Sequence, residues 1–81
     1  MTTLSQLRPG QRATIHSFRA GGPGGGALRR RCLEMGLVAG ETVHAERIAP
    51  LGDPRWFLVK GYRLALRKEE AALIRVIDVS P

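Results

Sequence analysis

Glycine and proline divide this chain into short apolar segments, and this division is the strongest constraint on its fold. The two residue types recur at 9–10, 21–26, 36, 40, 50–54 and 61. Because both end or bend regular structure, each segment between them has room for one short helix or strand. Short segments joined by tight turns are typical of a small sheet with antiparallel neighbours.

Apolar and polar residues alternate in several of these segments, as in strands that are half-buried on one face. We predict five strands, over 11–18, 42–49, 56–60, 62–67 and 74–79. In the first, Ala13 and Ile15 lie on the inner face, and in the second Val43 and Ala45 do. Phe18 is out of phase with the first strand, which predicts a bulge or a strand end there.

A helix is predicted for 27–35, followed by Gly36 as its C-terminal stop and Leu37 as the apolar residue that accompanies such a cap. Its apolar stripe consists of Leu28, Cys32 and Met35. The glycine run at 21–26 is predicted to be a loop because glycine loses the most backbone freedom on ordering. One further helical turn is predicted at 68–72.

Five short strands and one inserted helix indicate a mainly β fold, a small antiparallel barrel. Closing the sheet would remove its exposed edges. A chain of 81 residues holds one core, so residues 1–81 are expected to form a single domain. So small a domain has little room for a deep cleft, which argues against an enzyme.

Charge and cysteine content narrow the function classes. The net charge of +6 allows an anionic partner, but only residues 29–31 form a basic run. The single cysteine, Cys32, excludes an intrachain disulfide. Residues 1–7 have neither a basic start nor a long apolar run, and no segment approaches the roughly 20 apolar residues of a membrane span. We therefore expect a cytoplasmic protein.

The residues that most often carry chemistry do not form a recognisable motif. His16, His44 and Cys32 lack the spacing of a local metal site, so no metal ligands and no cofactor are expected. The glycine run at 21–26 matches neither of the common phosphate-binding motifs. No serine has a histidine and an acid in a context that suggests a catalytic triad.

Several segments of the chain resemble the ferrous-iron transport protein A (FeoA) family. They are LSQLRPG at 4–10, RRCLEMGLVAG at 30–40, APLGDP at 49–54 and GYRLALRKEEA at 61–71. The resemblance implies an SH3-like barrel and a cytoplasmic partner of the large membrane ferrous-iron transporter, whose cytoplasmic part hydrolyses GTP. It also implies kinship with the C-terminal domain of metal-dependent repressors. The chain departs from the family in its enlarged glycine run at 21–26 and in Cys32, where an aliphatic residue is usual.

The strand at 56–60 is expected to turn one face to the core and the other to a binding partner. The resemblance implies that Phe57 and Val59 point inward, which leaves Trp56 and Leu58 outside. A one-residue slip would exchange the faces and place Trp56 in the core, and the alternation itself leaves both registers open. An exposed tryptophan–leucine pair rimmed by basic residues is typical of a protein-binding hot spot.

These observations predict a non-enzymatic accessory protein of ferrous-iron uptake that binds the membrane transporter and supports or regulates it. Its net positive charge would allow it to lie beside an anionic leaflet. The candidate contact residues are Trp56, Leu58, Pro50, Leu51, Gly52, Asp53 and Pro54.

Two alternatives remain. The first is a small basic barrel that binds nucleic acid through Trp56, Lys60, Arg63 and Arg67, although the chain has few aromatic residues and an acidic pair at 69–70 lies nearby. The second is a stand-alone relative of the repressor domain.

Overall fold

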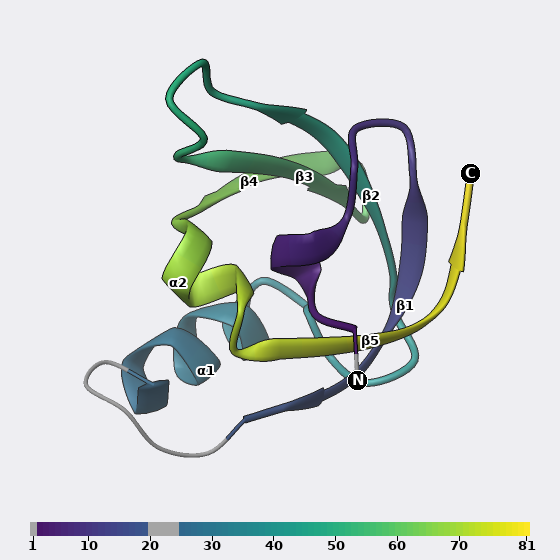
Figure 1. Cartoon of the computed structure of the whole chain (residues 1–81). Helices are drawn as coiled ribbons and strands as arrows, with labels where there is room; N and C mark the ends of the chain where they lie inside the picture. Colours follow the sequence, from purple (N-terminus) through teal and green to yellow (C-terminus); the bar gives the residue numbers. More distant parts are fainter. Residues whose placement is uncertain (1, 20–24) are drawn as a thin grey trace.

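Five strands form one antiparallel sheet in the order β4-β3-β2-β1-β5, which curls around a single core (Figure 1). The computed structural model describes residues 2–19 and 25–81. Its elements are η1 (Leu4–Gln6, a 3-10 turn), β1 (Arg12–Phe18), α1 (Gly25–Glu34), β2 (Thr42–Ile48), β3 (Arg55–Val59), β4 (Tyr62–Leu66), α2 (Lys68–Ala71) and β5 (Ile74–Ser80). The mainly β architecture predicted from the alternation is confirmed. Within the described ranges, no helix is both long and apolar enough to cross a bilayer.

The alternating residues of the strands fill the core. Ala13 and Ile15 of β1 are buried, as are Val43 and Ala45 of β2, so the predicted inner faces are confirmed. Further core residues come from β3, β4, β5, η1 and α1, and the largest of them is Phe57. All the buried residues that the structure describes are apolar.

The sheet does not close into a complete barrel, so the expectation that closure removes its edges was wrong. In the described part of the chain, β4 and β5 are the two ends of the strand order and share no ladder. The chain turns into α2 directly after β4, and η1 packs against α2 and β5. The free edge of β5 is instead covered by the N-terminal segment, because the Val76 N–H donates to the Thr2 carbonyl (2.8 Å).

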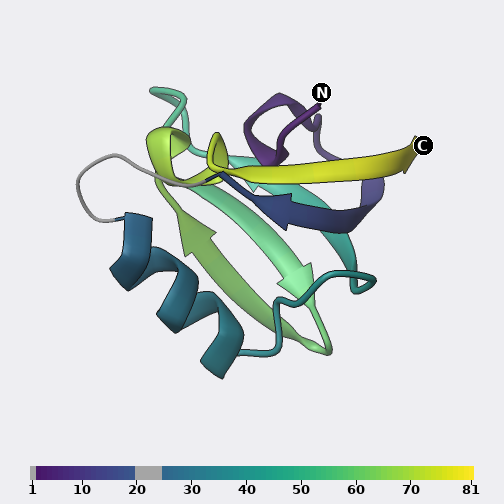
Figure 2. The same ribbon diagram turned by 90° about the horizontal axis from the view of Figure 1, so that it is seen from below.

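Helix α1 ends in the Schellman cap that the sequence predicts. Gly36 has φ +84°, its N–H donates to the Leu33 carbonyl (3.1 Å), and the Leu37 N–H donates to the Cys32 carbonyl (2.8 Å). The side chain of Leu37 is buried. Figure 2 shows α1 running alongside the curled sheet, with the connection to β2 leaving its C-terminal end.

The N-terminal boundary of α1 differs from the prediction. The helix begins at Gly25, so Gly25 and Gly26 belong to its first turn and not to a loop. First-turn N–H groups need no partner within the helix, which makes glycine tolerable there. The rest of the predicted loop, residues 21–24, lies outside the described residues.

The predicted irregularity near Phe18 is present in β1. The pairing of β1 with β5 shifts register between Ile15 and Ser17, and Phe18 then pairs with Ile74. The shift lets Phe18 pack against the same core as Ile15, although strict alternation would place them on opposite faces.

Candidate protein-binding groove

Strand β3 has the register in which Phe57 and Val59 face the core. These two side chains are 2% and 1% exposed, whereas Trp56 and Leu58 lie on the outer face. Trp56 pairs with Arg47 of β2 and Ala65 of β4. The tryptophan is therefore an outer-face residue flanked by strands on both sides.

The outer pair is less exposed than the sequence suggested. Trp56 and Leu58 are both partly buried, since neighbouring side chains cover them. The guanidinium carbon of Arg47 lies 5.6 Å from the centroid of the Trp56 ring, within the range of a cation–π contact. The Trp56 ring thus contacts the Arg47 guanidinium, and only part of its surface is exposed to solvent.

A bulge in β2 brings two charged residues to this face. The pairing of β2 with β3 shifts register between Ala45 and Arg47, which leaves Glu46 as the additional residue. Without the bulge, alternation from Ala45 would turn Arg47 inward. With it, Arg47 lies opposite Trp56 on the outer face.

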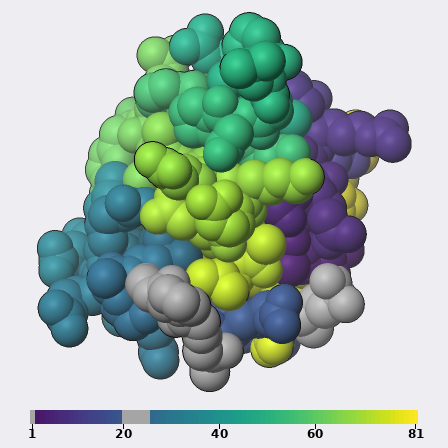
Figure 3. All heavy atoms as spheres, turned by 60° about the vertical axis from the view of Figure 1, so that its left-hand side comes forward, coloured from purple at the N-terminus to yellow at the C-terminus, as the bar shows by residue number. Residues whose placement is uncertain are grey.

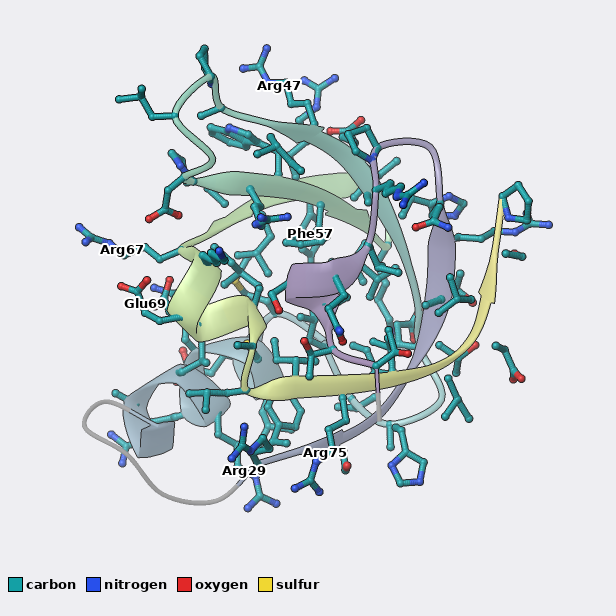
Figure 4. The ribbon with its side chains drawn as sticks, in the orientation of Figure 1. Arg29, Arg47, Phe57, Arg67, Glu69 and Arg75 are labelled. Carbon is teal, nitrogen blue, oxygen red and sulfur yellow. The ribbon has the colours of Figure 1, made fainter. Side chains whose placement is uncertain are left out.

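Strand β4 completes a groove across three strands. Its Arg63 pairs with Leu58 in the sheet, and the Arg63 Nε lies 2.8 Å from Glu46 Oε1. Glu46, Arg47, Trp56 and Arg63 together line an open groove of about 430 Å³. Figure 4 shows Arg47 projecting outward above β3, while Phe57 lies within the curl of the sheet.

The predicted contact loop at 50–54 stands beside this groove, between β2 and β3. The Gly52 N–H donates to the Ala49 carbonyl (2.7 Å), and Gly52 has φ +89°, a conformation that favours glycine. The side chain of Leu51 at the tip is 97% exposed. Pro50 and Pro54 are exposed as well, so the loop presents an apolar tip on a hydrogen-bonded base.

Asp53 anchors the same loop to α2. Its Oδ1 accepts a hydrogen bond from the Lys68 N–H (2.9 Å), at the first residue of α2. The space-filling view of Figure 3 shows α2 on the surface between α1 and the green segment that contains the loop. The loop and the helix are therefore tied together, while the Leu51 side chain lies almost wholly in solvent.

The candidate metal ligands lie apart. Cys32 is 0% exposed in the core, where burial raises the pKa of its thiol against the opposing charge of Arg31. His16 is exposed on β1, with Nδ1 3.0 Å from Ser17 Oγ, and His44 is exposed on β2. Over residues 2–19 and 25–81, no three His, Cys, Asp or Glu side chains gather as a metal site would require.

Two of the basic residues proposed for nucleic-acid binding, Lys60 and Arg63, are paired with carboxylates. Trp56 and Arg63 line the groove, where Arg63 is already paired with Glu46. Lys60 forms a separate ion pair with Glu41, with Nζ 3.6 Å from Oε2.

Sequence reasoning missed Glu46 and Arg47 as groove residues. The signal that could have found them is the charge of Arg47 itself. Strict alternation from Val43 and Ala45 assigns Arg47 an inward position, and an arginine in a core position of a strand is the mark of a bulge.

Several known proteins are similar to this chain in sequence and in fold. The family model described as the FeoA domain matches residues 2–78. A Porphyromonas gingivalis protein, the Fe(2+) transport protein A/Fe(2+) transporter FeoB fusion protein, is 41% identical over 77 residues. The match covers 95% of this chain but spans only 9% of that relative's length.

Two solved structures agree in fold. The FeoA protein of Chlorobium tepidum is 40% identical with a TM-score of 0.81, covering 93% of this chain and 68% of that one. The zinc complex of Stenotrophomonas maltophilia FeoA, described as an SH3 domain protein, is 33% identical with a TM-score of 0.82, covering 95% and 91%. The predicted SH3-like fold and the resemblance are thus confirmed, and the chain belongs to the FeoA family of ferrous-iron transport.

Proposed function

We propose that this chain is a non-enzymatic, cytoplasmic accessory domain that binds the cytoplasmic part of the membrane ferrous-iron transporter and supports or regulates uptake. The observation that carries the proposal is the relative named as a fusion of transport protein A with transporter FeoB. Fusion holds two modules at high effective concentration. With or without such a fusion, a domain that associates with the transporter needs a surface that contacts it.

The loop at 50–54 and the outer face of β3 provide that surface. Leu51 is an apolar side chain with almost its whole area in solvent. The loop that carries it is held by backbone hydrogen bonds and by Asp53, so little conformational entropy is lost when a partner covers it. Trp56 and Leu58 extend the apolar surface along the sheet.

The chemistry of the groove supports binding rather than catalysis. Its lining consists of two arginines, one tryptophan and a glutamate that is already paired. Arginine stays protonated at physiological pH and tryptophan is not a nucleophile, so these side chains recognise a ligand by charge and contact.

The proposal is tested with the purified cytoplasmic part of the transporter from the same organism, by calorimetric titration. Replacing Leu51 with Asp should weaken binding at least tenfold, because a buried leucine contributes about 1.5–3 kcal/mol. Trp56→Ala should also weaken binding while the domain still melts cooperatively.

Leu33→Asp is the matched control, since Leu33 is 46% exposed on α1, away from the loop. It should bind as the unaltered protein does. The proposal fails if the unaltered domain does not bind, or if Leu51→Asp binds as tightly as Leu33→Asp.

A further inference from the structure

The groove of Glu46, Arg47, Trp56 and Arg63 carries an excess of positive charge next to an apolar surface. We propose that it binds an acidic segment of the partner protein, in which a carboxylate lies next to an apolar residue. The carboxylate pairs with Arg47, and the apolar residue lies against Trp56 and Leu58. This inference rests on the proposed function and specifies the chemistry of the partner.

Arg47 is the available cation of the groove. The ion pairs of the described residues engage Arg31, Lys60 and Arg63 but not Arg47. The guanidinium carbon of Arg47 lies over the Trp56 ring, 5.6 Å from its centroid, and the guanidinium carries five N–H donors. A planar guanidinium held in this way can donate two parallel hydrogen bonds to one carboxylate.

Glu46 already occupies the second arginine. Its Oε1 lies 2.8 Å from Arg63 Nε, and the Arg63 side chain is 71% exposed. An exposed pair of this kind is weak, so an incoming carboxylate can compete for Arg63. Glu46 therefore competes with the ligand's carboxylate for Arg63. Removing the charge of Glu46 tests whether the ligand is an anion.

The apolar side of the groove determines what must flank the ligand's carboxylate. Leu58 pairs directly with Arg63, and Trp56 pairs with Arg47, so an apolar outer-face residue lies beside each arginine. The volume of about 430 Å³ accommodates a few side chains of an extended segment. An acidic residue with an apolar neighbour fits this arrangement.

Nucleic acid fits the same groove less well. Binding of a single strand relies on bases that stack on open aromatic faces, and here Arg47 covers the ring of Trp56. The observations thus favour a carboxylate on a peptide over a phosphate backbone.

Trp56 provides the assay, because it is the single tryptophan of the chain and lines the groove. Tryptophan-free peptides that tile the transporter's cytoplasmic part are titrated into the full chain, and the emission of Trp56 is followed. We expect the binding peptides to contain Asp or Glu next to an apolar residue, and their affinity to fall as salt rises.

Three variants test the assignment of charge. Arg47→Glu should weaken peptide binding at least tenfold, because it replaces attraction with repulsion. Arg29→Glu makes the same change of charge on α1, at the opposite end of the view in Figure 4, and should alter binding less than twofold. Glu46→Gln should tighten binding roughly two- to fivefold, the range spanned by exposed ion pairs. Each variant's thermal unfolding is recorded to exclude loss of fold.

The outcomes separate this inference from the proposed function. If the intact cytoplasmic part binds the unaltered domain and Arg47→Glu equally well, or if no acidic peptide binds, the acidic-segment inference is overturned while the proposed function stands. If the intact part does not bind at all, both fail. Displacement of the peptides by a mixed oligonucleotide at physiological salt would assign the groove to nucleic acid instead.

Discussion

Neighbouring residues on opposite faces of β3 give the sharpest test of the register. Phe57 is 2% exposed among core residues, whereas Trp56 lies on the outer face under Arg47. We compare Phe57→Ala with Trp56→Ala. If the register is as described, the smaller aromatic residue contributes more to stability than the larger one.

The expected magnitudes follow from what each side chain contacts. Phe57→Ala leaves a cavity in a packed core, which costs about 3–5 kcal/mol. Trp56→Ala loses a cation–π contact of about 0.5–1 kcal/mol and some apolar burial, while the flexible arginine can collapse into the space. We expect a total of about 1–2 kcal/mol. A domain of 81 residues has a free energy of unfolding of about 4–12 kcal/mol, so Phe57→Ala removes a large part of it.

The measurement is urea unfolding followed by far-ultraviolet circular dichroism, since Trp56→Ala removes the fluorescent reporter. With a slope of about 1 kcal/mol per molar urea, the midpoint should fall by about 1–2 M for Trp56→Ala and by about 3 M or more for Phe57→Ala. A Trp56→Ala protein that is equally or more destabilised would place Trp56 in the core and refute the register.

Three further perturbations test the local structure. Gly26→Ala should stabilise the protein by about 0.5 kcal/mol because alanine favours the helix. Gly36→Ala should destabilise it by about 1 kcal/mol or more, since φ is +84° and the new Cβ would lie 3.1 Å from the Lys60 side chain. The two variants should therefore shift the melting temperature in opposite directions. Asp53→Ala should cost about 1 kcal/mol through loss of the hydrogen bond to the Lys68 N–H, and Asp53→Asn should restore most of it in the same melt. Burial raises the folded-state pKa of Cys32 above the unfolded value of about 8.5, so the unfolded chain loses this proton first. Stability should therefore decline as the pH rises above about 8, and the slope should be smaller in Cys32→Ala than in the unaltered protein.

Local rules were sufficient for most of the fold. The inner faces of β1 and β2 follow from alternation at Ala13, Ile15, Val43 and Ala45, because each strand buries one side. The end of α1 follows from Gly36, since the cap needs a residue that tolerates positive φ. These features depend only on residues close together in the sequence.

The remaining features depend on contacts between distant segments. The register of β3 was ambiguous because Trp56 and Phe57 are both large aromatic residues, and only packing against the rest of the core selects one. The groove was missed because the bulge at Glu46 and Arg47 is defined against the partner strand. Whether the two end strands of the sheet pair is decided by packing between distant segments, which no local pattern encodes.

The hydrogen bond between Val76 and Thr2 has a consequence for how copies of the protein meet. The N-terminal segment covers the free edge of β5 and so hinders its pairing with a strand of another copy. Removal of residues 2–7 would leave the Val76 N–H without its partner and would withdraw Leu4 and Leu7 from the core. Such a shortened chain should self-associate strand to strand, so these few residues protect the edge of β5 as well as completing the core.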